Sequence, residues 1–115
     1  MIIDSHCHLS YKNNTENIDN VIQNANDVNV KKFLNIATNS DEFKDIVSIS
    51  SKYENIYYTL GIHPHEANGT TNAVIDEIKK YINDPKMLAI GETGLDFYYN
   101  HAEKNPQTRS LEMHI

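Results

Sequence analysis

The chain begins with MIIDSHCHLS (residues 1–10), an apolar run that leads directly into two histidines one residue apart. Side chains on a β-strand alternate between two faces, so Asp4, His6 and His8 are expected on one face. Cys7 is expected on the opposite face, packed against a helix as a small apolar residue. A bend at the strand end would let both imidazoles bind one ion, although two hydrogen-bonded histidines in a polar loop are the simpler explanation of this motif alone. Asp4 is either an acceptor that orients an imidazole or a polar residue at the strand start.

Three further short apolar runs are expected to be β-strands. Each is rich in bulky apolar residues and ends in a polar or glycine-containing turn, and they cover residues 33–37, 56–60 and 87–90. Apolar residues at helical spacing fill the segments between the strands, at residues 18–25, 43–53 and 74–82. The strand starts recur at roughly the 30-residue spacing of βαβ units. This spacing predicts parallel strands with right-handed crossovers.

Capping residues predict where some of these helices begin and end. Asn39 with Glu42 resembles a capping pair at the start of the second helix. The third helix is expected to stop at residues 83–85, because the proline there cannot continue it. A fourth helix is expected to open with Asn105 as its cap and Pro106 at its first position.

The third and fourth predicted strands end with further residues that can bind metals. LGIHPHE (residues 60–66) places His63 and His65 directly after the third strand. AIGETGLDFYYN (residues 89–100) places Glu92 directly after the fourth. A solvated loop or a surface turn would explain each of them alone, but in parallel α/β folds ligands and catalytic groups gather at the carboxyl ends of the strands. The coincidence predicts one shared site formed by His6, His8, His63, His65 and Glu92.

The composition is that of an ordinary globular domain. The 115 residues are 39% hydrophobic and 23% charged, and Cys7 is the only cysteine. A single cysteine excludes an intrachain disulfide and a cysteine-based zinc cluster, so any metal must be held by histidine and carboxylate. The net charge of −6 argues against a broad basic face for nucleic acid. No apolar run reaches the roughly 18 residues of a membrane span and no signal-like leader precedes the first strand, so a cytoplasmic location without membrane contact is expected.

The three quoted motifs, in this order, resemble the first signatures of the TatD family of metal-dependent hydrolases, often described as deoxyribonucleases. The resemblance covers nearly the whole chain. It implies an α/β fold of the (β/α) TIM-barrel type and two divalent metal cations as cofactors. It also implies DNA as the substrate, attacked at the phosphodiester by a hydrolase.

The resemblance further implies roles for individual residues. His6 and His8 match the paired ligands of one cation, and Glu92 matches the catalytic carboxylate that bridges both cations. His63 and His65 match a histidine pair on the substrate side, where the implied role is binding of a phosphate. The ligand types do not distinguish zinc from magnesium or manganese.

Two positions of the last predicted helix also compare with the family. Gln107 falls where the family has a glutamine at the start of the fourth helix. A later family glutamine is replaced here by His114.

A complete TIM barrel takes about 250 residues, so residues 1–115 are expected to form the N-terminal half of a TatD-like barrel, about four βα units. The ligands on later strands are then missing, and we expect little or no activity from this chain alone. Exposed strand edges would favour self-association, and the apolar positions Ile3, Ile36 and Ile90 should be poorly covered. Two alternatives stay open: a metal-dependent amidohydrolase acting on a small amide or ester, and a non-catalytic half-barrel remnant or assembly module.

Overall fold

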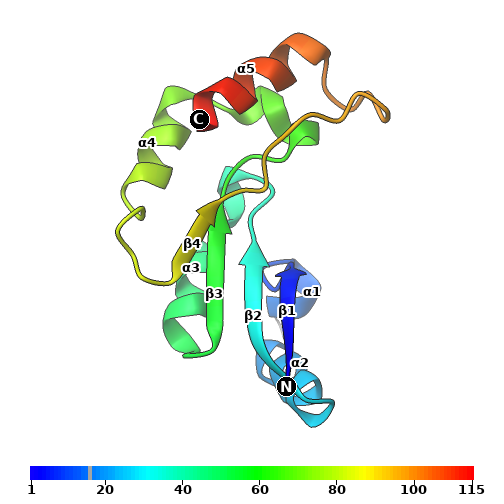
Figure 1. Ribbon diagram of the computed structural model, residues 1–115, viewed down its shortest axis with the longest axis vertical. Helices are drawn as coiled ribbons and strands as arrows, with labels where there is room; N and C mark the ends of the chain where they lie inside the picture. The colour runs from blue at the N-terminus through cyan, green and yellow to red at the C-terminus, as the bar shows by residue number, and fades with distance from the viewer. Residues whose placement is uncertain (16) are drawn as a thin grey trace.

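The computed structural model describes residues 1–15 and 17–115. Four strands form one parallel sheet in the order β1-β2-β3-β4 (Figure 1). They are β1 (Ile2–Cys7), β2 (Val30–Ile36), β3 (Ile56–Leu60) and β4 (Met87–Ile90). Every strand lies beside its neighbour in sequence, and helices separate consecutive strands. The predicted alternation of parallel strands and helices is confirmed.

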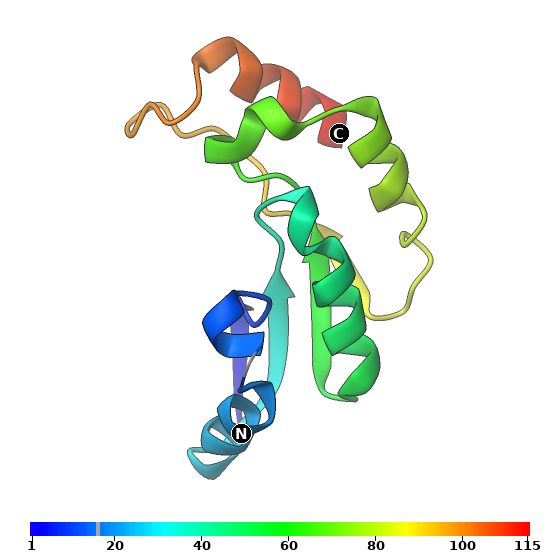
Figure 2. The same ribbon diagram turned by 180° about the vertical axis from the view of Figure 1, so that it is seen from behind.

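The helical segments lie between the strands and after the last one. They are α1 (Lys12–Thr15), α2 (Ile18–Asp27), η1 (Ser40–Glu42), α3 (Phe43–Lys52), η2 (Pro64–Gly69), α4 (Asn72–Lys79) and α5 (Lys104–His114). Seen from behind, α2 and α3 cover one face of the sheet (Figure 2). Among the helices of the described residues, none is long and apolar enough to cross a membrane.

The core lies between the sheet and the helices on this face. One cluster joins α3 and α4 to β3 around Phe43, Tyr58 and Leu60. A second cluster joins α2 to β2 around Ile22 and Phe33. Tyr58 and Leu60 stand two residues apart, as the alternation of a strand requires for residues that share a face. Because full burial of one such side chain contributes roughly 1.5–3 kcal/mol, these clusters fix the sheet whose carboxyl edge carries the candidate site.

Apolar residues of the two edge strands remain exposed. Ile3 on β1 is 55% exposed and Ile90 on β4 is 41% exposed, as expected for an open sheet. The same expectation for Ile36 is wrong, since it is only 5% exposed. Ile36 lies on β2, which has a strand on each side, and the ring of His8 contacts its carbonyl oxygen.

The helix boundaries partly follow the capping signals. The side chain of Asn39 accepts a hydrogen bond from the backbone N–H of Asp41 at 3.0 Å, which confirms this residue as a cap, although it caps the short turn η1 that leads into α3. The third helix was expected to reach residues 83–85, but α4 ends at Lys79 and turns follow it. The predicted cap Asn105 is wrong, because Glu103 is the N-cap and α5 begins at Lys104. Asn105 and Pro106 therefore lie inside the first turn of the helix. A proline is tolerated there because the first N–H groups of a helix have no partner within it.

Segments that follow β3 and β4 leave the sheet and pack against each other. In both views η2 and α5 lie side by side beyond the carboxyl ends of these strands (Figures 1 and 2). Thr70 and Ser110 share a buried hydrogen bond of 2.6 Å between their hydroxyl groups. The ring of His114 donates from Nδ1 to the carbonyl of Ser110 and accepts at Nε2 from the backbone N–H of Ile62. His114 therefore fixes α5 to the residue that precedes His63.

Candidate metal centre

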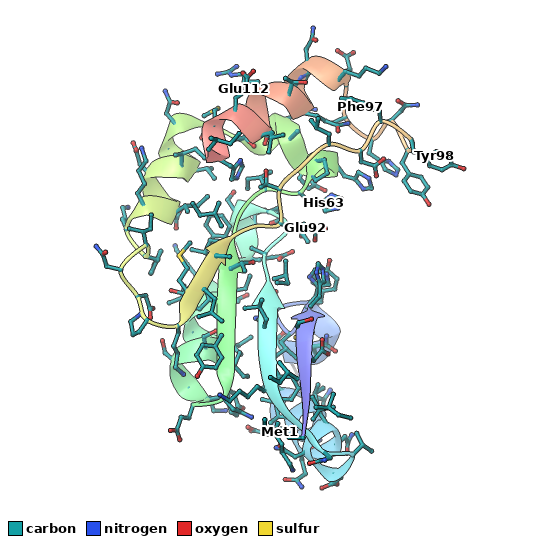
Figure 3. All side chains as sticks on the ribbon, in the orientation of Figure 1. Met1, His63, Glu92, Phe97, Tyr98 and Glu112 are labelled. Carbon is teal, nitrogen blue, oxygen red and sulfur yellow. The ribbon has the colours of Figure 1, made fainter. Side chains whose placement is uncertain are left out.

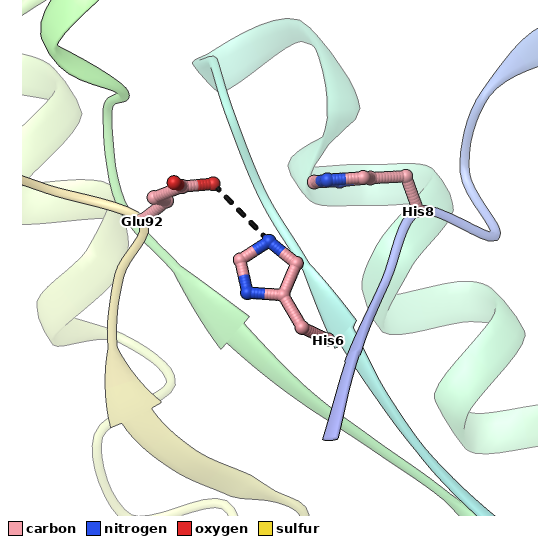
Figure 4. Close-up of side chains that lie close together, drawn as sticks. All are labelled: His6, His8 and Glu92. Atoms are coloured by element: carbon pink, nitrogen blue, oxygen red, sulfur yellow. Dashed lines mark ion pairs between the residues drawn. The ribbon is translucent and has the colours of Figure 1, made fainter. Parts of the chain in front are cut away.

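His6, His8 and Glu92 come together at the carboxyl edge of the sheet (Figure 4). One ligand atom from each residue lies within 4.8 Å of the other two. The Nε2 of His6 is 3.5 Å from Oε2 of Glu92. Two ligands bonded at about 2.0–2.2 Å to one tetrahedral ion stand roughly 3.3–3.6 Å apart. The pair already has the separation of two ligands of one cation.

An irregular end of β1 presents the two histidines together. The register of β1 against β2 shifts between Asp4 and Cys7, and such a shift bends a strand. The carboxylate of Asp4 accepts a hydrogen bond from the backbone N–H of His6 at 3.1 Å, so Asp4 fixes the backbone here. Cys7 packs against the α2 cluster as expected. Burial, followed by the charge of Asp4, raises the pKa of its thiol to about 12, so the thiol is protonated at neutral pH.

His8 is held in the tautomer that a metal ligand needs. Its Nδ1 lies 3.0 Å from the carbonyl oxygen of Ile36. A carbonyl only accepts hydrogen bonds, so Nδ1 carries the proton and Nε2 keeps a free lone pair. A backbone partner of this kind is what orients ligating histidines in metal sites. Tyr11 stacks on the ring of His8 with the ring centroids 4.8 Å apart, which restricts the ring further.

Backbone contacts with the ends of β2 and β3 place Glu92. The N–H of Gly91 donates to the carbonyl of Leu60, and the N–H of Glu92 donates to the carbonyl of Ala37, each at 2.9 Å. The peptide bond between Gly91 and Glu92 is cis. Gly61 lies directly against this segment, and a Cβ at that position would stand 2.6 Å from the carbonyl carbon of Gly91. Only glycine fits there without moving the backbone that carries Glu92.

His63 lies close to Glu92 (Figure 3). It comes from the segment between β3 and η2, whereas His6 comes from β1. Its Nε2 is 3.6 Å from Oε1 of Glu92. Its Nδ1 accepts a hydrogen bond from the backbone N–H of His65 at 3.1 Å, so the neutral ring carries its proton on Nε2. Burial lowers the pKa of His63, although the charge of Glu92 acts in the opposite direction. A neutral imidazole in this tautomer is a hydrogen-bond donor at Nε2, which separates its chemistry from that of His8.

His65 is turned toward the loop that follows β4. Its Nε2 lies 2.5 Å from Oδ2 of Asp96, a short charge-assisted contact. This hydrogen bond is the largest cause that lowers the pKa of the Asp96 carboxyl, and the backbone N–H groups of Tyr98 and Tyr99 lower it further. The sequence analysis missed Asp96. A carboxylate four residues after Glu92 within the same motif was the available signal.

Gln107 fixes the loop that carries Asp96. Its side chain is fully buried. Its Oε1 accepts from the backbone N–H of Asp96 at 2.7 Å, and its Nε2 donates to the carbonyls of Asp96 at 2.9 Å and Ala102 at 2.8 Å. A buried amide with both of its groups paired holds its neighbours firmly. α5 thereby positions the partner of His65.

All five predicted site residues line one open cavity of about 390 Å³. Its walls are formed by His6, His8, Tyr11, Thr38, His63, His65, Glu66 and Glu92. Two imidazoles and a carboxylate are a donor set that suits a divalent first-row cation. Ligands of a tetrahedral ion stand about 3.3–3.6 Å apart. The three ligand atoms lie within 4.8 Å of one another, so rotation of the side chains must bring the wider pairs closer by up to about 1.5 Å. The residues fit a cation.

The parallel βα sheet carries two histidines on its first strand and a glutamate after its fourth strand. Functional groups gathered at the carboxyl edge in this way are typical of (β/α) barrels. The chain belongs to the family described as TatD related DNase, whose model matches residues 3–115.

Individual relatives agree with this assignment. The chain is 36% identical over 123 residues to an uncharacterized metal-dependent hydrolase of Buchnera aphidicola subsp. Acyrthosiphon pisum, covering 99% of this chain and 47% of the relative. It is 32% identical over 97 residues to the 3'-5' ssDNA/RNA exonuclease TatD of Salmonella typhimurium, covering 84% and 37% respectively. The chain thus spans less than half the length of these curated relatives.

The fold also matches a solved structure. The crystal structure of YJJV, a TatD homolog from Escherichia coli k12, superimposes with a TM-score of 0.85 and 24% sequence identity, over 98% of this chain and 44% of that one. This agreement confirms the expected α/β fold as part of a TatD-type (β/α) barrel.

Proposed function

We propose that residues 1–115 form the N-terminal half of a TatD-type barrel domain and contribute one half of a metal-dependent phosphodiesterase site that acts on DNA. The observation that carries this proposal is the convergence of His6, His8 and Glu92 at the carboxyl edge of the sheet. Related proteins named as metal-dependent hydrolase and as ssDNA/RNA exonuclease support the reaction class and the substrate.

In this proposal His6, His8 and Glu92 hold a divalent cation, and the second carboxylate oxygen of Glu92 is available to a second cation. A bound cation supplies Lewis-acid polarisation of a phosphoryl oxygen and lowers the pKa of bound water. Histidine and carboxylate together admit zinc, manganese or magnesium. The acidic net charge of −6 is compatible with a nucleic-acid substrate because bound cations supply positive potential where the phosphate binds.

His63 and His65 are assigned to the substrate phosphate. The proton on Nε2 of neutral His63 makes it a donor to a phosphate oxygen beside Glu92. Asp96 fixes the ring of His65 through its Nε2. Glu92 is assigned the catalytic role because its two oxygens stand between His6 on one side and His63 on the other.

Hydrolysis of a labelled single-stranded oligonucleotide by the purified chain, with manganese or zinc and with Glu92→Ala as the control, tests the reaction class. We expect metal-dependent turnover far below that of an intact family member, because loss of single charge-positioning groups typically costs about 10²–10³ in rate. Losses within one catalytic unit do not simply add. Metal-dependent cleavage of acyl amides or esters without cleavage of phosphodiesters would replace this proposal with the amidohydrolase alternative.

A further inference from the structure

We propose that Tyr98 and Tyr99, on the loop after β4, form a stacking platform for unpaired nucleobases next to the phosphate bound at the metal centre. This inference rests on the proposed function, because it names the part of the substrate that the loop binds. It assigns a base-binding site outside the metal ligands and the histidine pair.

The two tyrosines are unusually open to solvent. Tyr98 is 83% exposed and Tyr99 is 63% exposed. Tyr98 stands on the outermost part of the loop (Figure 3). Their rings meet edge to face, with centroids 4.9 Å apart and an interplanar angle of 87°. The ring of His101 lies nearly parallel to that of Tyr99, with centroids 5.9 Å apart and an interplanar angle of 17°, so Tyr98 carries the more open ring face. An open aromatic face is what a nucleobase stacks on.

The loop backbone that carries these rings is fixed. Oδ1 of Asp96 accepts the backbone N–H of Tyr98 at 3.0 Å and that of Tyr99 at 3.3 Å. The buried amide of Gln107 holds Asp96 from the other side through its N–H and its carbonyl. The fixed backbone therefore holds both rings at the surface, where a partner can reach them.

The platform is continuous with the metal site. The same Asp96 that holds the tyrosine backbone binds His65 through its other oxygen, Oδ2. The ring of Tyr99 stands 5.9 Å from His65, and His65 stands 4.4 Å from His63, measured between ring centroids. The Nε2 atom of His63 in turn lies 3.6 Å from Oε1 of Glu92. A strand with a phosphate at Glu92 can therefore run past His63 and His65 and place bases a few nucleotides further along on Tyr99 and Tyr98.

The acidic net charge of the chain means that its affinity for nucleic acid must come from contacts other than lysine and arginine. Lysine and arginine contacts to phosphates supply most sequence-independent affinity for nucleic acid, but here acidic residues outnumber basic ones by 16 to 10. Stacking on aromatic rings supplies affinity without positive charge and tolerates every base. A base in a duplex is already stacked on its neighbours, so the platform selects unpaired strands. A partner protein is the less favoured occupant, since the rings adjoin a site built for a small charged group.

Fluorescence anisotropy with two labelled probes of equal length tests the proposal. One probe is a thymidine 12-mer, and the other carries the same phosphates with abasic sugars in place of nucleosides. Binding is measured with manganese and again in EDTA, so that the preference for bases is read with and without bound cations and does not depend on turnover. We expect the base-bearing probe to bind at least about tenfold more tightly than the abasic one. The Tyr98→Ala/Tyr99→Ala variant should abolish this difference, whereas Tyr98→Phe/Tyr99→Phe should keep it.

Three results would overturn the proposal. The first is equal affinity for the two probes, including no binding to either. The second is an unchanged preference in the alanine variant, and the third is equal binding of a duplex and a single strand. Urea unfolding of each variant checks the fold, and both tyrosines are exposed enough that no change is expected. Base-dependent binding together with metal-dependent cleavage of acyl amides or esters, and not of phosphodiesters, would leave the platform standing and reject the proposed function. Metal-dependent hydrolysis of the oligonucleotide without base-dependent binding would do the reverse.

Discussion

Replacing Gly61 with alanine tests whether close backbone packing positions Glu92. Gly61 follows β3 and lies against the segment that carries Glu92. A Cβ at position 61 would stand 2.6 Å from the carbonyl carbon of Gly91, 2.7 Å from its Cα and 2.9 Å from the carbonyl oxygen of Glu92. All three neighbours are backbone atoms, so no side-chain rotation can relieve the contact.

The size of the effect follows from these distances. Ordinary van der Waals contact starts near 3.4 Å, so the contact of 2.6 Å must lengthen by about 0.8 Å. Overpacking of a well-packed region typically costs about 1–3 kcal/mol. The same shift moves Glu92 relative to His6, and misplaced support of a metal ligand typically costs about 10–100-fold in affinity. We therefore expect Gly61→Ala to lose both stability and metal affinity.

Urea unfolding and calorimetric titration with manganese measure the two effects on the same samples. Gly69→Ala is the matched control, because a Cβ at position 69 meets nothing within 4 Å. The control should bind the metal as the wild type does. If Gly61→Ala matches Gly69→Ala in both stability and affinity, the packing of Gly61 does not position Glu92.

Three further predictions concern stability and assembly. Gln107→Ala removes three hydrogen bonds of a fully buried amide and should cost about 2–4 kcal/mol in urea unfolding. Thr108 is exposed and its hydroxyl bonds only to Lys104 within α5, so Thr108→Ala should cost less than about 1 kcal/mol, and equal losses would contradict this. Folding lowers the pKa of the Asp96 carboxyl below its ordinary value of 3.8. The ionised carboxylate therefore stabilises the fold fully above pH 3.8, and this stabilisation is lost as the pH falls through the lower pKa of the folded protein. The difference in unfolding free energy between wild type and Asp96→Asn should therefore shrink below about pH 4, and a difference that does not vary with pH would count against the pairing with His65. Finally, the exposed edge strands β1 and β4 should cause self-association, visible by sedimentation velocity as the concentration rises, and a monodisperse monomer with a cooperative high-temperature melt would refute this.

Periodicity and motif order predicted the parts of the fold that depend on short-range pattern. The four strands, their parallel order and the capping role of Asn39 follow from apolar runs and local hydrogen bonding. Coverage of Ile36 was mispredicted because it depends on which strands flank β2 and on the contact with His8, both of which are long-range. The early end of α4 was also mispredicted, since the chain turns at residues 80–84 before it reaches the proline.

The sequence predicted which residues come together at the candidate site, but not how their side chains are oriented or protonated. Alternation along β1 and the shared carboxyl edge indicated that His6, His8 and Glu92 would converge. The tautomer of His8 depends on a carbonyl 28 residues away in sequence, and no local pattern encodes such a contact. The pairing of His65 with Asp96, across 31 residues, is long-range for the same reason.

Metal titration of the purified chain tests the central claim that His6, His8 and Glu92 form a cation site. Zinc or manganese is titrated calorimetrically into wild type, the His6→Ala/His8→Ala variant, Glu92→Ala and His63→Ala. We predict saturable binding by the wild type, loss in the first two variants and retention in His63→Ala, whose Nδ1 is occupied and whose Nε2 carries a proton in the neutral ring. Equal affinity of wild type and the His6→Ala/His8→Ala variant would contradict the account.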